Sequence, residues 1–208
     1  MLFHVTLRHN PEDCPGRNPD KARASRVYFA DREARQRELG YQVRAFVGAW
    51  PSHLEYALVE TQDLATVNRW IGTFPNQDKA TVTAVGHMAD LINQGQAQQP
   101  ERSDRADPPG SAGMLFHLTM EHSLQHCPGR NPELIKGLQE RYKQREQRSK
   151  ETGVRVHFFV SAEPSHVTYA LLEAESVECV RRWLMRYPVP QDVIVTPVQR
   201  MAVLLSSG

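Results

Sequence analysis

The sequence lacks an excess of charge of either sign and lacks any long apolar run. Its 25 Lys and Arg residues nearly balance 24 Asp and Glu residues, for a formal net charge of +1 at pH 7. Binding to nucleic acid or to an anionic membrane through charge needs a basic surplus, so neither is expected as a partner. No segment approaches the ~20 apolar residues of a membrane-spanning helix, and the first residues, MLFHVTL, show no leader pattern. We therefore expect a cytoplasmic protein.

Cysteine is also scarce. The three cysteines, Cys14, Cys127 and Cys179, are too few for a disulfide framework, and their odd number favours reduced thiols. Reduced thiols remain available for metal binding or thiol chemistry.

What the sequence does contain is a duplication. Met1 aligns with Met114, and the same offset holds without a gap to the end of each copy, so that MLFHVTLRHNPEDCPGRNPD lies over MLFHLTMEHSLQHCPGRNPE. The segment between the copies is rich in Gln, Pro, Gly and charge and has no apolar face to bury. The sequence thus predicts a first repeat at 1–92, a flexible linker at 93–113 and a second repeat at 114–205.

Each repeat has the pattern of strand, helix, strand, strand, helix, strand. In the first repeat we expect strands at 2–8, 42–49, 54–60 and 81–88, with a helix from Asn18-Pro19 to Gly40 and another from Asp63. The second repeat has the same pattern, and Trp70 and Trp183 fall among the apolar helix positions that should enter the core. This βαββαβ order predicts an α+β fold of two ferredoxin-like repeats, each with both helices on one face of an antiparallel sheet.

The exposed sheet face of each ferredoxin-like unit needs a partner. In this respect the sequence resembles the dimeric α/β-barrel superfamily, in which two such units pack sheet to sheet. The resemblance implies a pseudo-dimer within one chain, with further oligomerisation left open. The superfamily includes small monooxygenases, isomerases, haem enzymes of the chlorite dismutase type and a small nickel-binding group, so the fold does not choose the chemistry.

Strand alternation places His4 and His117 on the sheet face opposite the helices. Phe3, Val5 and Leu7 should meet the helices, while His4 should point into the space between the sheets beside Phe46, as His117 should beside Phe159. Tyr56 and Tyr169 are expected on the helix face. The alternative for His4 and His117 is a core histidine hydrogen-bonded to a neighbour.

Histidine and cysteine recur at matching positions in both copies. The spacing H-x4-H-x4-C joins His4, His9 and Cys14, and a further histidine, His53, follows a Pro-Ser turn. Imidazole and thiolate are ligands of nickel, copper, zinc and iron, so the pattern indicates a transition-metal site. The candidate ligands of the second copy are His117, His122, Cys127 and His166. The spacing matches no standard motif, and His4 could share a metal with His9 only across a turn or bulge, so loop and packing roles are the alternative.

The block Cys-Pro-Gly-Arg-Asn-Pro is shared intact by the two copies. Pro-Gly favours a type II turn, and Asn-Pro favours a helix N-cap followed by the first helical residue. Arg17 and Arg130, beside the free N–H groups of a helix start, could bind a carboxylate or phosphate, or could simply pair with an acidic neighbour.

Three hypotheses follow. The first is a metal-binding protein, or metal-dependent enzyme, with one His/Cys site per repeat. The second is a cofactor-independent monooxygenase or isomerase that uses His4 as acid or base and Arg17 to hold an anionic small-molecule substrate. The third, implied by the resemblance, is haem bound between the sheets with a histidine as axial ligand.

Overall fold

The computed structural model describes residues 1–75, 78–92 and 113–201. Apart from Gly113, the predicted linker lies outside the described residues. The described chain forms two compact units: residues 1–75, 78–85 and 198–201 belong to the first, and residues 86–92 and 113–197 to the second. Both units combine helices with an antiparallel sheet, and both follow the predicted βαββαβ order, so the α+β fold of two ferredoxin-like repeats is confirmed.

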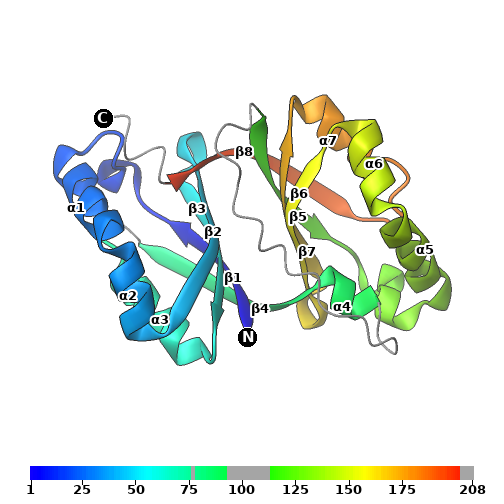
Figure 1. The fold of residues 1–208 in the computed structure, drawn as a ribbon, viewed down its shortest axis with the longest axis horizontal. Coiled ribbons are helices and arrows are strands. Elements are labelled where there is room, and N and C mark those ends of the chain that lie inside the picture. Colours follow the sequence, from blue (N-terminus) through cyan, green and yellow to red (C-terminus); the bar gives the residue numbers. More distant parts are fainter. Residues whose placement is uncertain (76–77, 93–112, 202–208) are drawn as a thin grey trace. The chain divides into compact units, whose positions relative to one another are not determined.

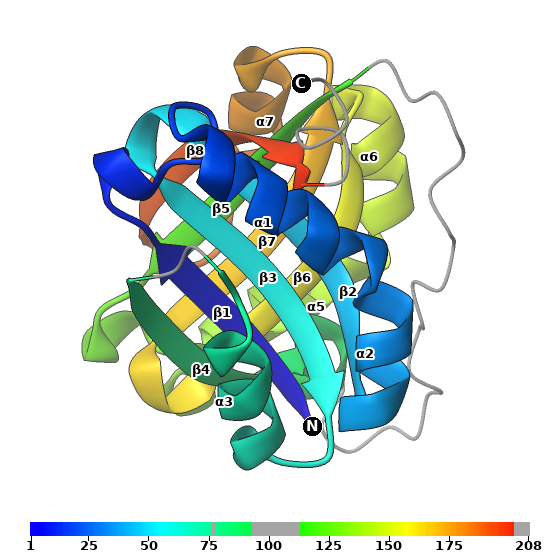
Figure 2. The ribbon, with the colours of Figure 1, turned by 90° about the vertical axis from the view of Figure 1, so that its left-hand side faces the viewer.

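The first unit is a four-stranded sheet with helices on one face (Figure 1). Its elements are β1 (Leu2–Arg8), α1 (Pro19–Ala30), α2 (Arg32–Leu39), β2 (Tyr41–Ala49), β3 (Leu54–Thr61), α3 (Leu64–Gly72) and β4 (Lys79–His87). The strand order is β4-β1-β3-β2, and Figure 2 shows the three helices in front of these strands. The end of β8 (Asp192–Arg200) adds to the open edge, where Arg200 and Gln199 pair with β2.

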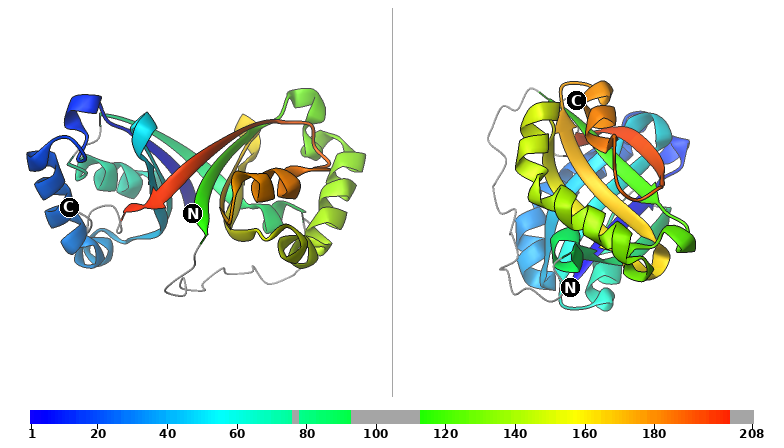
Figure 3. Two further views of the ribbon diagram at one scale, coloured as in Figure 1. Left: turned by 90° about the horizontal axis from the view of Figure 1, so that it is seen from above. Right: turned by 90° about the vertical axis from the view of Figure 1, so that its right-hand side faces the viewer.

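The second unit repeats this arrangement, with its helices in front of the sheet in the right panel of Figure 3. Its elements are α4 (Met88–Ile92), β5 (Met114–Glu121), α5 (Pro132–Lys143), α6 (Arg145–Thr152), β6 (Arg155–Ala162), β7 (Val167–Ala174), α7 (Val177–Leu184) and β8. The strand order is β8-β5-β7-β6, and the last residues of β4, Gly86 and His87, pair with β6. Each repeat therefore lends the end of its last strand to the unit formed by the other repeat.

The helix that begins each repeat starts where the Asn-Pro dipeptide predicts. The Asn18 side chain accepts hydrogen bonds from the N–H groups of Asp20 and Lys21, as Asn131 does at the start of α5. The single helix expected up to Gly40 is divided, because Asp31 leaves helical geometry at φ −97° and ψ 10°. The second repeat divides its helix at the equivalent place, between α5 and α6, at a residue that is neither Gly nor Pro. No local sequence signal predicts this break.

The helix-facing side of the sheet carries the apolar core, as alternation predicts. Phe3, Val5 and Leu7 of β1 are buried against Val67 and Trp70 of α3. Phe116, Leu118 and Met120 of β5 form the equivalent core with Val180 and Trp183 of α7. The prediction that both tryptophans are core residues is confirmed.

The face predicted for the phenylalanines of the second strand is wrong. Phe46 lies on the helix side, with its ring centroid 6.0 Å from that of Trp70, and Phe159 lies 5.8 Å from Trp183. The cause is an irregularity of strand pairing, between Val43 and Ala45 and at the equivalent place in β6, which adds one residue and reverses the alternation beyond it.

The tyrosines of the third strand also lie on the face opposite to the predicted one. Tyr56 pairs with Thr6 in the sheet, and its ring centroid is 6.2 Å from that of His4. Tyr169 lies 6.1 Å from His117 in the second unit. Directly paired residues share a sheet face, so both tyrosines accompany the strand histidines on the face away from the helices.

Candidate metal centres

Sheet register brings the first group of candidate ligands to one end of the first sheet. Arg8, the last residue of β1, pairs with Leu54, the first residue of β3, so the residues just beyond them, His9 and His53, are neighbours. The His9 N–H donates to the His53 carbonyl at 3.3 Å. A single 3₁₀ turn at Pro11–Asp13 then returns the chain, and Cys14 follows it directly.

The second repeat builds the same arrangement at the end of β5 and β7. Glu121 pairs with Val167, and the next residue, His122, donates its N–H to the His166 carbonyl at 3.1 Å. A 3₁₀ turn at Leu124–His126 again precedes the cysteine, Cys127. Two repeats with different intervening residues have thus kept the same backbone path around the same three side chains.

In each repeat the two imidazoles and the thiol converge. One ligand atom from each of His9, Cys14 and His53 lies within 4.8 Å of the others, and the same holds for His122, Cys127 and His166. His9 Nε2 is 3.3 Å from His53 Nδ1. Two nitrogens bound to one tetrahedral Zn²⁺ lie about 3.3 Å apart, so the first pair already has the spacing of metal ligands.

The ring arrangement does not depend on a hydrogen bond between the histidines. In both repeats the ring centroids are 5.2 Å apart and the rings are nearly perpendicular. Yet in the second repeat the corresponding atoms, His122 Nε2 and His166 Nδ1, are buried and make no hydrogen bond to any described residue. A buried nitrogen without a partner is costly, and coordination to a cation would satisfy both of these atoms at once.

The histidine of the hairpin turn has a strained backbone in both repeats. His53 has φ 52° and ψ 37°, and His166 has φ 54° and ψ 32°, which is the left-handed region that side chains other than glycine seldom occupy. A third residue of this kind among the described ones, Arg186, lies elsewhere. Retention of this conformation at a histidine in both repeats fits a side chain that must point in one fixed direction.

Electrostatics keep His9 and His122 in the form that binds metals. Burial is the largest cause of the lowered pKa of His9, and nearby His53 lowers it further, whereas Asp13 raises it. The pKa of His122 is lowered by burial, then by His166 and by His126. A lowered pKa leaves the imidazole neutral near pH 7, with a lone pair free to coordinate.

A buried carboxyl group, which the sequence reasoning missed, lies beside the first centre. Glu55 Oε1 is 3.6 Å from His9 Nδ1, and burial raises the pKa of Glu55 to about 8. The signal was available in the sequence, because Glu55 stands in the apolar strand LEYALVE two residues after His53. Glutamate is seldom buried without a partner, so its place in a buried strand marks Glu55 as a candidate functional residue.

The predicted type II turn after the cysteine is wrong. Among the described glycines only Gly40 and Gly153 have positive φ, so Gly16 and Gly129 are not there for backbone freedom. A Cβ at Gly16 would lie 2.6 Å from the ring of Trp50, which shows that glycine is needed for close approach of that ring.

The predicted anion-binding arginines are at the surface. Arg17 and Arg130 are both exposed, just before the Asn N-caps of α1 and α5. Two of the helix N–H groups that could have held an anion in each repeat already donate to the Asn18 or Asn131 side chain. The anion site therefore stays a prediction, with fewer free donors than the sequence indicates.

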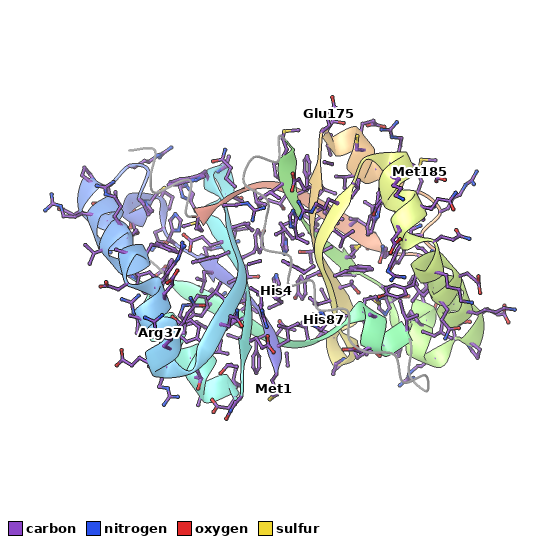
Figure 4. All side chains as sticks on the ribbon, in the orientation of Figure 1. Met1, His4, Arg37, His87, Glu175 and Met185 are labelled. Carbon is purple, nitrogen blue, oxygen red and sulfur yellow. The ribbon has the colours of Figure 1, made fainter. Side chains whose placement is uncertain are left out.

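The strand histidines lie apart from both groups. His4 is buried on β1 (Figure 4), and His117 is buried at the equivalent place on β5, but neither belongs to a metal-ligating group of the described residues. The odd spacing between His4 and His9 explains the separation, since His9 lies just beyond the strand where the chain turns away. Burial lowers the pKa of His4 to about 3.

Comparison with known proteins supports the fold. No protein-family model matches the sequence, and a search of curated proteins finds no match. Over 99% of its length the chain is similar to a solved structure of a chlorite dismutase variant from Candidatus Nitrospira defluvii, with a TM-score of 0.61, 8% identity and 94% of that chain covered. The same enzyme in complex with imidazole gives a TM-score of 0.57 at 7% identity, with 99% and 94% of the two chains covered.

A variant of that enzyme in complex with cyanide is similar over 98% of this chain and 93% of its own, with a TM-score of 0.57 and 10% identity. The present chain therefore shares the fold of these structures, which agrees with the α+β fold predicted from the element order. At such low identity the likeness shows the fold alone. Within the described residues, none of the helices has the length and apolarity required to cross a membrane.

Proposed function

We propose that this protein binds transition-metal ions at two centres, one in each repeat, that each combine two histidines with one cysteine. His9, Cys14 and His53 form the first of these His/Cys centres, and His122, Cys127 and His166 form the second. The observation that carries the proposal is the recurrence of three converging ligand atoms in both repeats. In the second repeat both ligand nitrogens are also buried without a hydrogen bond to a described residue, which is the state that a bound cation would relieve.

The ligand set defines the class of metal. Two imidazole nitrogens and one thiolate suit zinc, nickel or copper, whereas calcium and magnesium prefer oxygen. Three protein ligands leave one position of a tetrahedral site for water or a small molecule, which is the pattern of catalytic and not of structural zinc sites. The metal-dependent enzyme among our sequence hypotheses is compatible with such a site.

Cobalt binding to the metal-free protein tests the proposal directly. Co²⁺ added to the full chain should give a thiolate-to-cobalt charge-transfer band that saturates at two equivalents, and Cys14→Ala with Cys127→Ala should abolish the band. Cys179→Ala is the matched control, because Cys179 is also buried and reduced but belongs to neither group. Elemental analysis of the purified chain should agree with this count.

Other outcomes would redirect the proposal. If Cys14→Ala with Cys127→Ala retained full metal content, or if cobalt gave no thiolate band, the two His/Cys centres would be wrong. Loss of metal in a variant with both His4 and His117 replaced by Ala, at unchanged far-ultraviolet circular dichroism, would move the ligands to the strands instead.

The acid–base alternative is weakened by the electrostatics of His4. An efficient general base has a pKa near the working pH, whereas burial lowers that of His4 to about 3. A neutral, buried imidazole can instead ligate iron, so haem is the second candidate, with His4 or His117 as axial ligand. An intense Soret band in the purified protein would favour haem over the His/Cys centres.

A further inference from the structure

The two centres share their ligands but differ in one buried neighbour. Glu55 lies on β3 two residues after His53, and its side chain is almost fully buried. Its Oε1 faces His9 Nδ1 at 3.6 Å, and its Oε2 makes no hydrogen bond to any described residue. A buried carboxyl group that faces a candidate ligand is expected to act on that ligand.

The two nitrogens of the His9 ring have different neighbours. Nε2 is 3.3 Å from His53 Nδ1 and faces the centre, whereas Nδ1 faces Glu55. Glu55 is not a member of the converging ligand group. It would therefore act through His9: accepting the Nδ1 proton fixes the tautomer in which Nε2 carries the lone pair, and it fixes the plane of the ring.

The second repeat has no such group. Thr168 occupies the position equivalent to Glu55 and is also buried, and its hydroxyl donates to Ser161 Oγ at 3.4 Å. His126 is the counterpart of Asp13, so the second centre also has a basic neighbour where the first has an acidic one. The exchange at Glu55 favours tighter metal binding in the first centre, because the second centre has no carboxyl group at the equivalent position to orient its ligand.

We propose that Glu55 is a positioning residue for His9 and makes the first centre the tighter of the two, so that metal fills the first centre before the second. This inference rests on the proposed function. The distance of 3.6 Å is longer than a hydrogen bond, so the proposed role requires His9 Nδ1 and Glu55 Oε1 to approach each other when a metal binds. A partner of this kind changes metal affinity by about 10- to 100-fold.

Zinc competition with a chelating indicator tests the proposal on the full chain. The first centre is isolated by His122→Ala with His166→Ala, and the second by His9→Ala with His53→Ala. In the first background, Glu55→Thr should weaken Zn²⁺ binding about 10- to 100-fold, whereas Glu55→Gln, whose amide oxygen can still accept the His9 proton, should recover most of the loss. In the second background, Glu55→Thr should leave the affinity unchanged.

The reciprocal change, Thr168→Glu, provides a gain-of-function test in the second centre, with an expected increase in Zn²⁺ affinity. Cobalt spectra of the first centre give an independent readout, since a reoriented imidazole should shift the d–d bands in Glu55→Thr but not in Glu55→Gln. Circular dichroism checks that each variant folds.

The failures of the two proposals are distinguishable. If the unmodified chain binds no zinc at either centre, the proposed function and the role of Glu55 both fall. If it binds two zinc ions with equal affinity, or if Glu55→Thr and Glu55→Gln weaken the first centre equally, the metal centres stand and the role of Glu55 is wrong.

Discussion

The two repeats have kept the same three candidate ligands while their surroundings have diverged. Around the first centre lie Glu55, Asp13 and Trp50, and the equivalent positions of the second repeat hold Thr168, His126 and Glu163. Every one of these exchanges alters charge or bulk. Backbone hydrogen bonds, ring geometry and the left-handed histidine are nevertheless the same in both. The three retained ligands therefore define the chemistry that the two centres share. The exchanged neighbouring residues are where the two centres can differ in metal affinity.

The largest expected effect is on metal content, and it tests whether the two centres are independent. Replacing His9 and His53 by Ala should remove one of two metal equivalents, and replacing His122 and His166 should remove the other, because the ligands of each centre come from a single repeat. Metal content per chain, measured by elemental analysis, should fall from two to one in each double variant. If either variant lost both ions, the comparison of two self-contained centres would fail.

A second comparison is between the buried strand histidine, His4, and the loop histidines in their effect on the pH dependence of stability. His4 has a folded-state pKa of about 3 because of burial, against an ordinary value of 6.5. At pH values between these two, the His4 side chain is protonated in the unfolded chain and neutral in the folded chain. Its contribution to the free energy of unfolding is therefore fully present above pH 6.5 and is lost as the pH falls towards 3. The loss should be at most about 1.4 kcal/mol per pH unit.

Urea denaturation of the metal-free protein at pH 7, 5.5 and 4.5 measures this slope, and His4→Gln should reduce it by about one proton. His53→Asn, which changes a loop histidine to a residue that tolerates positive φ, serves as the matched control for the loss of one imidazole. An unchanged slope in His4→Gln would mean that the buried His4 is not the group that takes up the proton.

The sequence predicts the order of the elements better than the faces of the strands. The gapless repeat and the helix caps were enough for the βαββαβ order, and agreement between the copies singled out His4, His9, Cys14 and His53, of which the last three lie together. These features depend on local signals and on pairing rules that act over short stretches of chain.

The sequence could not predict the face of β2 on which Phe46 lies, because that face depends on one extra residue in the strand. The irregularity in β2 moved Phe46 to the helix side, and no Gly or Pro marks its place between Val43 and Ala45. The separation of His4 from His9 likewise depends on where the strand ends and the chain turns. The role of Glu55 was hidden because its partner in contact, His9, is distant in sequence and has no acidic equivalent in the second repeat.

The smallest expected effect is on stability, and it tests how the two repeats differ around the shared Cys-Pro-Gly loop. Gly16 lies against the Trp50 ring, where a Cβ would be 2.6 Å from Cζ3, whereas a Cβ at Gly129 would be 3.5 Å from Glu163 Oε2, an ordinary contact with an exposed side chain. Gly16→Ala should therefore destabilise the protein by about 1–3 kcal/mol through overpacking against a rigid ring, and Gly129→Ala by less than about 1 kcal/mol. Urea denaturation of the metal-free variants measures both, and Trp50→Glu, which copies the second repeat, should remove the penalty of Gly16→Ala. Equal penalties in the two repeats would show that the glycine is kept for the loop backbone itself and not for the ring that covers it.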